Sequence, residues 1–276
     1  MNPIATLIAA QALHWRTPGE PLIIGICGTQ ASGKSTASAQ VAAHLSGQGL
    51  RVGVMSLDDL YLSSAARRAL AESIHPLFVT RGPPGTHDVG LGMEVLDAVR
   101  AGKSVRLPRF AKALDEPLPV SEWPLLEAGC DVFLFEGWCV GARSQDDADL
   151  SMPANALEAD EDPDAIWRRY FNNHLGGATG DLFSRIDRLI YLRPPSFEVV
   201  YTWRCQQEHE LIAAADPAGA PAAMSDTQIA RFIAHYERMT RHMMAEMPPR
   251  ADLLIQLDEA RAIVSSHCDS LDRSRT

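Results

Sequence analysis

The sequence predicts an α/β fold in which helices cover both faces of a mainly parallel, five-stranded sheet. Two observations support this prediction: short apolar runs of strand length alternate with longer helical patterns, and the runs are apolar on both faces. Strands of this kind are typical of parallel sheets that helices cover on both sides. The five expected strands are residues 22–27, 51–57, 131–135, 188–192 and 251–257.

Helical patterns fill much of the chain around these strands. The N-terminal apolar run lacks a preceding basic segment, so we expect a packed or surface helix there rather than a signal peptide. The expected helices are residues 1–15, 34–45, 164–175, 196–214 and 225–247.

Three further segments have the composition of loops. They are rich in glycine or proline and cover residues 80–87, 106–124 and 215–223. Long loops inside a compact domain are commonly binding loops or lids. We therefore expect a single domain over residues 1–276, which comprises an N-terminal helical extension (1–20), ligand-binding loops (76–124) and a helical lid region (196–247).

The composition argues against several classes of protein. Lys and Arg total 25 against 35 Asp and Glu, which gives a net charge of −10. Sequence-independent binding to nucleic acid or to anionic membranes needs basic surface, so neither partner is expected. No apolar run approaches the ~18 residues of a membrane span. The five cysteines are scattered without CxxC spacing, which favours a reducing cytoplasm over a zinc or disulfide framework.

A glycine-rich motif joins the first expected strand to the first long helix. Residues 28–35 read GTQASGKS and fit the pattern G-x-x-x-x-G-K-[ST]. The glycines let several backbone N–H groups point at one phosphate, and the helix aims the positive end of its dipole at the same anion. The motif predicts a P-loop NTPase with a three-layer α/β/α fold that binds ATP. The expected nucleotide-binding residues are Gly28, Gln30, Ala31, Ser32, Gly33, Lys34, Ser35 and Thr36.

Carboxylates follow two other strands at the edge where ligands bind in open α/β sheets. Asp58 and Asp59 follow the second strand, and Glu136 follows the third. Phosphoryl transfer needs a group that accepts the proton of the nucleophile and groups that hold Mg²⁺. We expect Asp58 to accept the proton, Lys34 to contact the β- and γ-phosphates, and the metal site to draw on Ser35, Asp58 and Glu136. Asp59 either contacts the substrate or caps a helix.

Basic and polar residues on the loops provide a candidate pocket for the phosphate acceptor. Arg81, His87 and Asp88 lie in or just after the first loop, and Arg109 and Lys112 lie in the second. Each of them alone is more typical of a solvated loop residue than of a binding residue. Together they could bind an anionic group, because arginine pairs well with carboxylates and phosphates.

Arg204 lies in the expected lid helix after the fourth strand. An arginine in a lid can neutralise the charge that develops on a transferred phosphoryl group, which would make Arg204 catalytic. The alternative is a surface pair with Glu208, four residues further along the same helix.

With these motifs the sequence resembles the phosphoribulokinase, uridine kinase and pantothenate kinase superfamily. Within it, the chain is most similar to the plant-type D-glycerate 3-kinases and their bacterial relatives, in family order from about residue 20 to 257. The matching segments are GTQASGKST (28–36), SLDDLYL (56–62), TRGPPGTHDV (80–89), LPRF (107–110), FEGW (135–138), Trp203-Arg204, and MSDTQI (224–229) with Tyr236 following.

The resemblance implies an ATP- and Mg²⁺-dependent small-molecule kinase that converts D-glycerate to 3-phosphoglycerate. It also implies that Asp58 is the base. The residues implied in acceptor binding are Asp59, Tyr61, Arg81, His87, Asp88 and Arg109.

The sequence departs from this family pattern at one position. Relatives usually carry an aspartate directly after the aromatic residue of the LPR[FY] segment, where this chain has Ala111. The acceptor therefore stays open between D-glycerate and another hydroxylated metabolite, such as a sugar acid, a nucleoside or a pantothenate-like molecule. A nucleotide-binding module without kinase activity is the third alternative, although the chain lacks an NKxD-type motif of GTPases.

Overall fold

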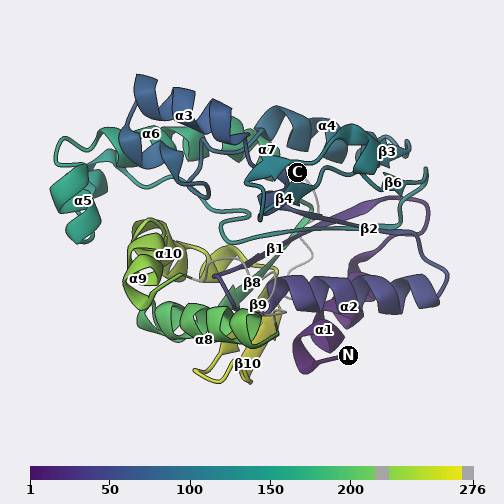
Figure 1. Cartoon of the computed structure of the whole chain (residues 1–276). Coiled ribbons are helices and arrows are strands. Elements are labelled where there is room, and N and C mark those ends of the chain that lie inside the picture. The colour runs from purple at the N-terminus through teal and green to yellow at the C-terminus, as the bar shows by residue number, and fades with distance from the viewer. Residues whose placement is uncertain (215–223, 269–276) are drawn as a thin grey trace.

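The computed structural model describes residues 1–214 and 224–268 (Figure 1). Its main sheet has six strands in the order β10-β9-β8-β1-β7-β2. Neighbouring strands from β2 to β9 run parallel, and only β10 is antiparallel to its neighbour. The strands are β1 (Leu22–Gly28), β2 (Val52–Ser56), β7 (Val132–Gly137), β8 (Arg188–Arg193), β9 (Leu253–Leu257) and β10 (Ile263–Cys268).

The predicted α/β class and all five predicted strands are present, but the sheet has a sixth strand that the sequence analysis missed. This strand, β10, forms an edge of the sheet, and most of its residues are exposed. Its sequence, IVSSHC, therefore lacks the continuous apolar character that marks the buried strands. The predicted loop at 106–124 contains the short strand pair β4 (Phe110–Ala111) with β5 (Glu116–Pro117). A second pair, β3 (Val105–Arg106) with β6 (Leu125–Leu126), lies at its two ends.

Helices form a layer on each side of the sheet. Figure 1 shows α3, α4, α6 and α7 on one side and α1, α2 and α8 on the other. The α-helices are α1 (Pro3–Trp15), α2 (Lys34–Gly47), α3 (Ser64–Ser73), α4 (Val89–Arg100), α5 (Ala156–Glu161), α6 (Ile166–Gly176), α7 (Ala178–Phe183), α8 (Glu198–Ala214), α9 (Asp226–Ala234) and α10 (Glu237–Glu246). The 3₁₀ turns are η1 (Leu57–Leu60), η2 (Pro76–Val79), η3 (Val120–Glu122), η4 (Asp147–Leu150) and η5 (Pro248–Arg250).

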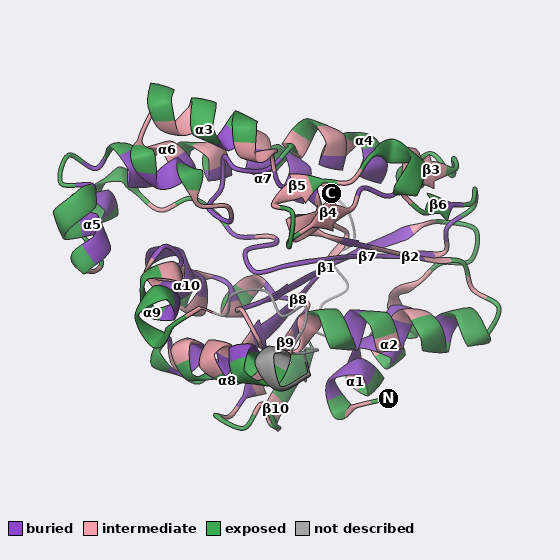
Figure 2. Cartoon of the chain, viewed as in Figure 1, coloured by how far each residue is buried: buried purple, intermediate pink, exposed green. Residues whose placement is uncertain are grey.

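The central strands are buried on both faces, as their apolar sequences predict (Figure 2). Successive side chains of a strand point to opposite faces of the sheet. In β1, Ile24 and Ile26 join the apolar cluster that contains α1 and α2, whereas Ile23 and Cys27 join the cluster that contains α4, α6 and α7. The sheet is thereby held rigidly between two cores, and its carboxyl edge provides a fixed platform.

Several helices differ from the sequence prediction. The expected N-terminal helix is present as α1 and packs through its buried face against α2. The expected helix at 225–247 is two helices, because the chain turns at His235 and Tyr236 between α9 and α10. Helices α3, α4, α5 and α7 were not predicted. The predicted loop at 215–223 lies outside the described residues. No helix in the described ranges is both long and apolar enough to cross a membrane.

Candidate active site

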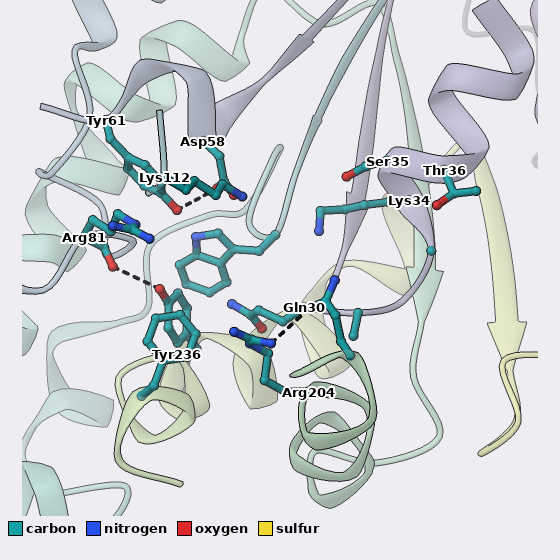
Figure 3. A pocket seen from close by; sticks show the side chains of 15 residues that line it. Gln30, Lys34, Ser35, Thr36, Asp58, Tyr61, Arg81, Lys112, Arg204 and Tyr236 are labelled. Carbon is teal, nitrogen blue, oxygen red and sulfur yellow. Dashed lines mark hydrogen bonds and ion pairs between the residues drawn. The ribbon is translucent and has the colours of Figure 1, made fainter. Parts of the chain in front are cut away.

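A pocket of about 300 Å³ lies at the carboxyl edge of the sheet (Figure 3). Its walls come from the loop between β1 and α2, from η1, from the segments after η2, β4 and β7, and from α8 and α9. The lining residues are Gln30, Ala31, Gly33, Lys34, Ser35, Thr36, Asp58, Tyr61, Arg81, Lys112, Trp138, Arg204, Gln207, Phe232 and Tyr236.

The phosphate loop has the conformation that its glycines predict. Gly33 is the N-cap of α2 with φ 89°, a left-handed conformation that side chains rarely adopt. A Cβ atom on Gly28 would lie only 2.7 Å from Ser32 Oγ. Neither Gly28 nor Ser32 lines the pocket, so these two shape the loop from behind.

The start of α2 and the Lys34 side chain provide donors that can bind an anion. The first N–H groups of α2 lack partners within the helix, as at every helix start. Lys34 Nζ makes one long contact, 3.4 Å to the carbonyl oxygen of Thr29. The buried side-chain oxygens of Thr29, Gln30 and Ser32 have no partner among the described residues. Buried polar groups are rarely left unpaired, and of these three side chains Gln30 lines the pocket.

Ser35 and Glu136 form a pair beside the phosphate loop. The Ser35 hydroxyl donates to Glu136 Oε1 at 2.8 Å, and Glu136 is 4% exposed. The other carboxylate oxygen, Oε2, is buried and has no partner in the described part of the chain. Hydroxyl and carboxylate oxygens are ligands that Mg²⁺ prefers. No cluster of three or more His, Cys, Asp or Glu side chains within residues 1–214 and 224–268 could hold a metal alone. The pair therefore fits a Mg²⁺ ion whose remaining ligands would come from nucleotide phosphates.

Asp58 faces the phosphate loop from η1 on the opposite wall. Its Oδ1 atom accepts from the Tyr61 hydroxyl at 2.6 Å, and its Oδ2 atom accepts from Lys112 Nζ at 2.5 Å. Burial alone would raise the pKa of Asp58, but the charges of Lys112 and Lys34 outweigh it and lower that pKa to about 2. The carboxylate is therefore ionised at neutral pH. Both of its carboxylate oxygens have partners on this wall, Tyr61 and Lys112.

Arg81 and Tyr61 complete the wall around Asp58. The Arg81 guanidinium forms an ion pair with Asp115 and lies 6.0 Å from the ring centroid of Tyr61. The carbonyl oxygen of Arg81 accepts from the Tyr236 hydroxyl at 3.0 Å, the contact drawn in Figure 3. Arg81 is thus held through both its side chain and its backbone, and it lines the pocket.

Four predicted acceptor residues do not line the pocket. Asp59 belongs to a capping box with Ser56, so the capping alternative is the one that the structure contains. Asp88 is exposed and caps α4 by accepting from Leu91 N at 2.9 Å. Arg109 contacts Asp59 at 3.4 Å behind the wall.

His87 is the fourth of these residues. It is buried behind Tyr61, and the two ring centroids lie 4.9 Å apart. Burial lowers the pKa of His87 to about 4, so the ring is neutral at pH 7. These four residues shape the wall, and Tyr61 and Arg81 present it to the pocket.

Arg204 forms the ion pair with Glu208 that its sequence position allows, and it also lines the pocket. Its guanidinium pairs with Glu208 at 2.6 Å, one turn further along α8. The same side chain lines the pocket opposite Asp58 (Figure 3). The pair holds the arginine beside the phosphate loop.

Sequence reasoning did not assign three aromatic residues that line the pocket: Trp138, Phe232 and Tyr236. Trp138 Nε1 donates to the carbonyl oxygen of Gly82 at 3.0 Å, and its ring packs edge-on against Tyr236 at 4.8 Å. Gly82 has φ 124°, and a Cβ atom there would lie 2.0 Å from the Tyr236 hydroxyl oxygen. Gly82 of the RGPPG segment therefore allows this close approach. Trp138 and Tyr236 were both within the segments that resemble the glycerate kinase family, although no role was assigned to them.

Comparisons with known proteins identify the family of this chain. No family model matches it. The kinase mug58 of Schizosaccharomyces pombe is 33% identical over 228 residues, which cover 79% of each chain. The chain belongs to this family of P-loop kinases. The predicted class, an ATP-dependent phosphotransferase, is thereby confirmed.

Two further relatives bear on this kinase. The chloroplastic D-glycerate 3-kinase of Arabidopsis thaliana is 27% identical over 259 residues, which are 87% of this chain and 53% of that protein. A solved structure of a D-glycerate 3-kinase from Cryptococcus neoformans superposes with a TM-score of 0.78 at 24% identity. The superposition covers 97% of this chain and 100% of that one. The structural match confirms the fold of the kinase.

Proposed function

We propose that this kinase transfers the γ-phosphate of ATP to the 3-hydroxyl group of D-glycerate and forms 3-phosphoglycerate. One observation carries the proposal: a single pocket holds the phosphate loop on one wall and Asp58, Arg81 and Lys112 on the other. A hydroxy acid matches that second wall, with a hydroxyl group for the carboxylate and a carboxylate for the cations. The names of the plant and fungal relatives support the same acceptor.

Lys34 and Arg204 act on the nucleotide side in this proposal. The N–H groups at the start of α2 and the Lys34 ammonium bind the phosphates of ATP. Arg204 of α8 lines the same pocket and neutralises the charge that develops on the transferred phosphoryl group in the transition state. Its partner Glu208 holds the guanidinium in place before the nucleotide arrives.

Ser35 and Glu136 would hold the magnesium ion of this reaction. The unpaired Oε2 atom of Glu136 and the Ser35 hydroxyl supply oxygen ligands at the edge of the phosphate loop. When bound, Mg²⁺ neutralises charge on the β- and γ-phosphate oxygens. Glu136 also orients the Ser35 hydroxyl, because that hydroxyl donates to it.

Asp58 orients the acceptor and takes its proton. The acceptor oxygen forms a bond to the γ-phosphorus while the bond from that phosphorus to the β–γ bridging oxygen breaks. ADP leaves with the electron pair of that bond, and the hydroxyl proton passes to Asp58. A carboxylate with a pKa of about 2 is a weak base. This suits a loose transition state, in which the proton leaves late and the carboxylate chiefly orients the nucleophile.

A second acceptor class has one observation in its favour. Relatives usually carry an aspartate at the position of Ala111, and here that residue forms part of β4 in the hairpin that carries Lys112. An alanine removes a group that could pair with acceptor hydroxyls, which favours a different sugar acid. We also propose a cytoplasmic location, on the cysteine pattern alone.

A panel of acceptors tests these proposals. ADP release would be followed with D-glycerate, L-glycerate, other sugar acids, a nucleoside and pantothenate, each with and without Mg²⁺. We expect the highest kcat/KM with D-glycerate and no turnover when Mg²⁺ is chelated. Faster turnover of another acid would replace the acceptor and keep the kinase. No stimulation by any acceptor would favour a nucleotide-binding module.

A further inference from the structure

We propose that Lys112 determines the specificity of this kinase for acidic acceptors. Its ammonium group binds the carboxylate of the acceptor and, in leaving Asp58, frees the Oδ2 atom that takes the hydroxyl proton. The inference rests on the proposed function and gives Lys112, one of several candidate cations on the acceptor loops, a specific role in selecting the acceptor. Binding of the acceptor carboxylate by Lys112 and release of Asp58 for proton transfer therefore occur together.

The contact between Lys112 and Asp58 requires such an exchange. Lys112 Nζ lies 2.5 Å from Asp58 Oδ2, and the Tyr61 hydroxyl occupies Oδ1 at 2.6 Å. An acceptor hydroxyl that approaches Asp58 must therefore compete with the ammonium group. A neutral alcohol offers that ammonium no other anion. An acidic acceptor offers a second carboxylate, so the lysine exchanges one ion pair for another at little net cost.

The hairpin formed by β4 and β5 fixes the backbone of Lys112 but leaves its side chain free to move. Asp59 Oδ1 accepts from Phe110 N at 3.4 Å before the lysine, and Arg67 pairs with Asp115 at 2.5 Å after it. The Lys112 side chain itself is 60% exposed, against 28% for Asp58. A flexible ammonium on an anchored hairpin can turn between two carboxylates that lie a few ångströms apart.

The other cations that line the pocket are less suited to this exchange. Lys34 belongs to the phosphate loop, and Arg204 pairs with Glu208 on the same helix. Arg81 is held by Asp115 and by the ring of Phe110, whose centroid lies 5.7 Å away. Among the lining residues, Lys112 is the cation whose carboxylate partner is itself the proposed base. Arg81 can still assist, since it presents a fixed positive charge to the same acceptor.

The test compares D-glycerate with glycerol, in which a hydroxymethyl group replaces the carboxylate. We would measure kcat/KM for both acceptors in the unaltered kinase, in Lys112→Met and in Lys112→Arg. Lys103→Met is the matched control, because Lys103 is exposed beyond the end of α4 and does not line the pocket. The ratio of kcat/KM for D-glycerate over glycerol should fall about 10- to 100-fold in Lys112→Met. Lys112→Arg should keep most of the ratio, and Lys103→Met should not change it.

A second measurement decides the matter if glycerol turnover is too slow to follow. D-lactate has the carboxylate and 2-hydroxyl group of D-glycerate but no 3-hydroxyl group, so under the proposed transfer to the 3-hydroxyl it acts as an inhibitor. Its inhibition constant should rise about 10- to 100-fold in Lys112→Met, while the KM for ATP stays within the range of the control.

Two results would overturn the inference. One is an equal loss of kcat/KM for both acceptors, which leaves their ratio unaltered. The other is an unchanged inhibition constant for D-lactate. Failure of the proposed function looks different, because the unaltered kinase would then release no ADP in response to D-glycerate.

Discussion

The two walls of the pocket are built in different ways. The nucleotide wall comes mainly from one continuous stretch, residues 30–36, with Glu136 of the adjacent strand β7 behind it and Arg204 of α8 beside it. The acceptor wall comes from segments far apart in the chain, which ion pairs join: Lys112 to Asp58 across 54 positions and Arg81 to Asp115 across 34. Backbone conformation therefore fixes the first wall, and side-chain charge fixes the second. Substitutions should accordingly separate the two walls in kinetic measurements.

The largest effect is expected at Asp58. Asp58→Asn keeps the size of the side chain and removes the proton acceptor, so kcat should fall about 100- to 10,000-fold. The nucleotide wall is untouched, and the Kd of a non-hydrolysable ATP analogue should stay the same. Asp97→Asn is the control, because Asp97 pairs with Arg185 on the surface of α4. A kcat within threefold of the control would remove Asp58 from the proposed chemistry.

A smaller effect is expected on the nucleotide wall. Glu136→Gln removes the charge that faces the proposed metal, so the Mg²⁺ concentration for half-maximal activity should rise about 10- to 100-fold. The KM for D-glycerate should not change. Glu122→Gln in the exposed turn η3 serves as the control. An unchanged Mg²⁺ requirement, measured by titration at fixed ATP, would mean that Glu136 only orients Ser35.

The smallest kinetic effect should come from the anchor of the acceptor wall. Arg67 is 3% exposed and donates to the carbonyl oxygens of Leu62 and Val79 as well as to Asp115. Arg67→Met leaves these acceptors unpaired, so the free energy of unfolding should fall by about 1–3 kcal/mol. The KM for D-glycerate should rise while the KM for ATP does not. The neighbouring exposed residue provides the control, Arg68→Met. Equal shifts in both KM values would contradict the division into two walls.

The same contrast explains what could be predicted from the sequence. The phosphate loop is a local motif, and the residues around Lys34 lie where the motif predicts. The buried strands were predicted because burial on both faces leaves an apolar sequence. The edge strand β10 was not predicted, because its exposed residues are largely polar.

The acceptor wall was predicted less completely. The sequence could not show whether Asp59 and Asp88 face the ligand or the ends of helices, because both uses favour the same residue type. It also could not place Trp138 against Tyr236, which are joined only by tertiary packing. The ion pair between Lys112 and Asp58 depends on the path of the hairpin, which no local pattern specifies.

The position of the transferred phosphate tests the central claim most directly. The purified kinase would be incubated with ATP, Mg²⁺ and D-glycerate, and the product would be identified by phosphorus and carbon NMR. The proposed function predicts phosphate on the 3-hydroxyl group, in an amount equal to the ADP released. Phosphate on the 2-hydroxyl group, or ADP without any phosphorylated glycerate, would contradict it.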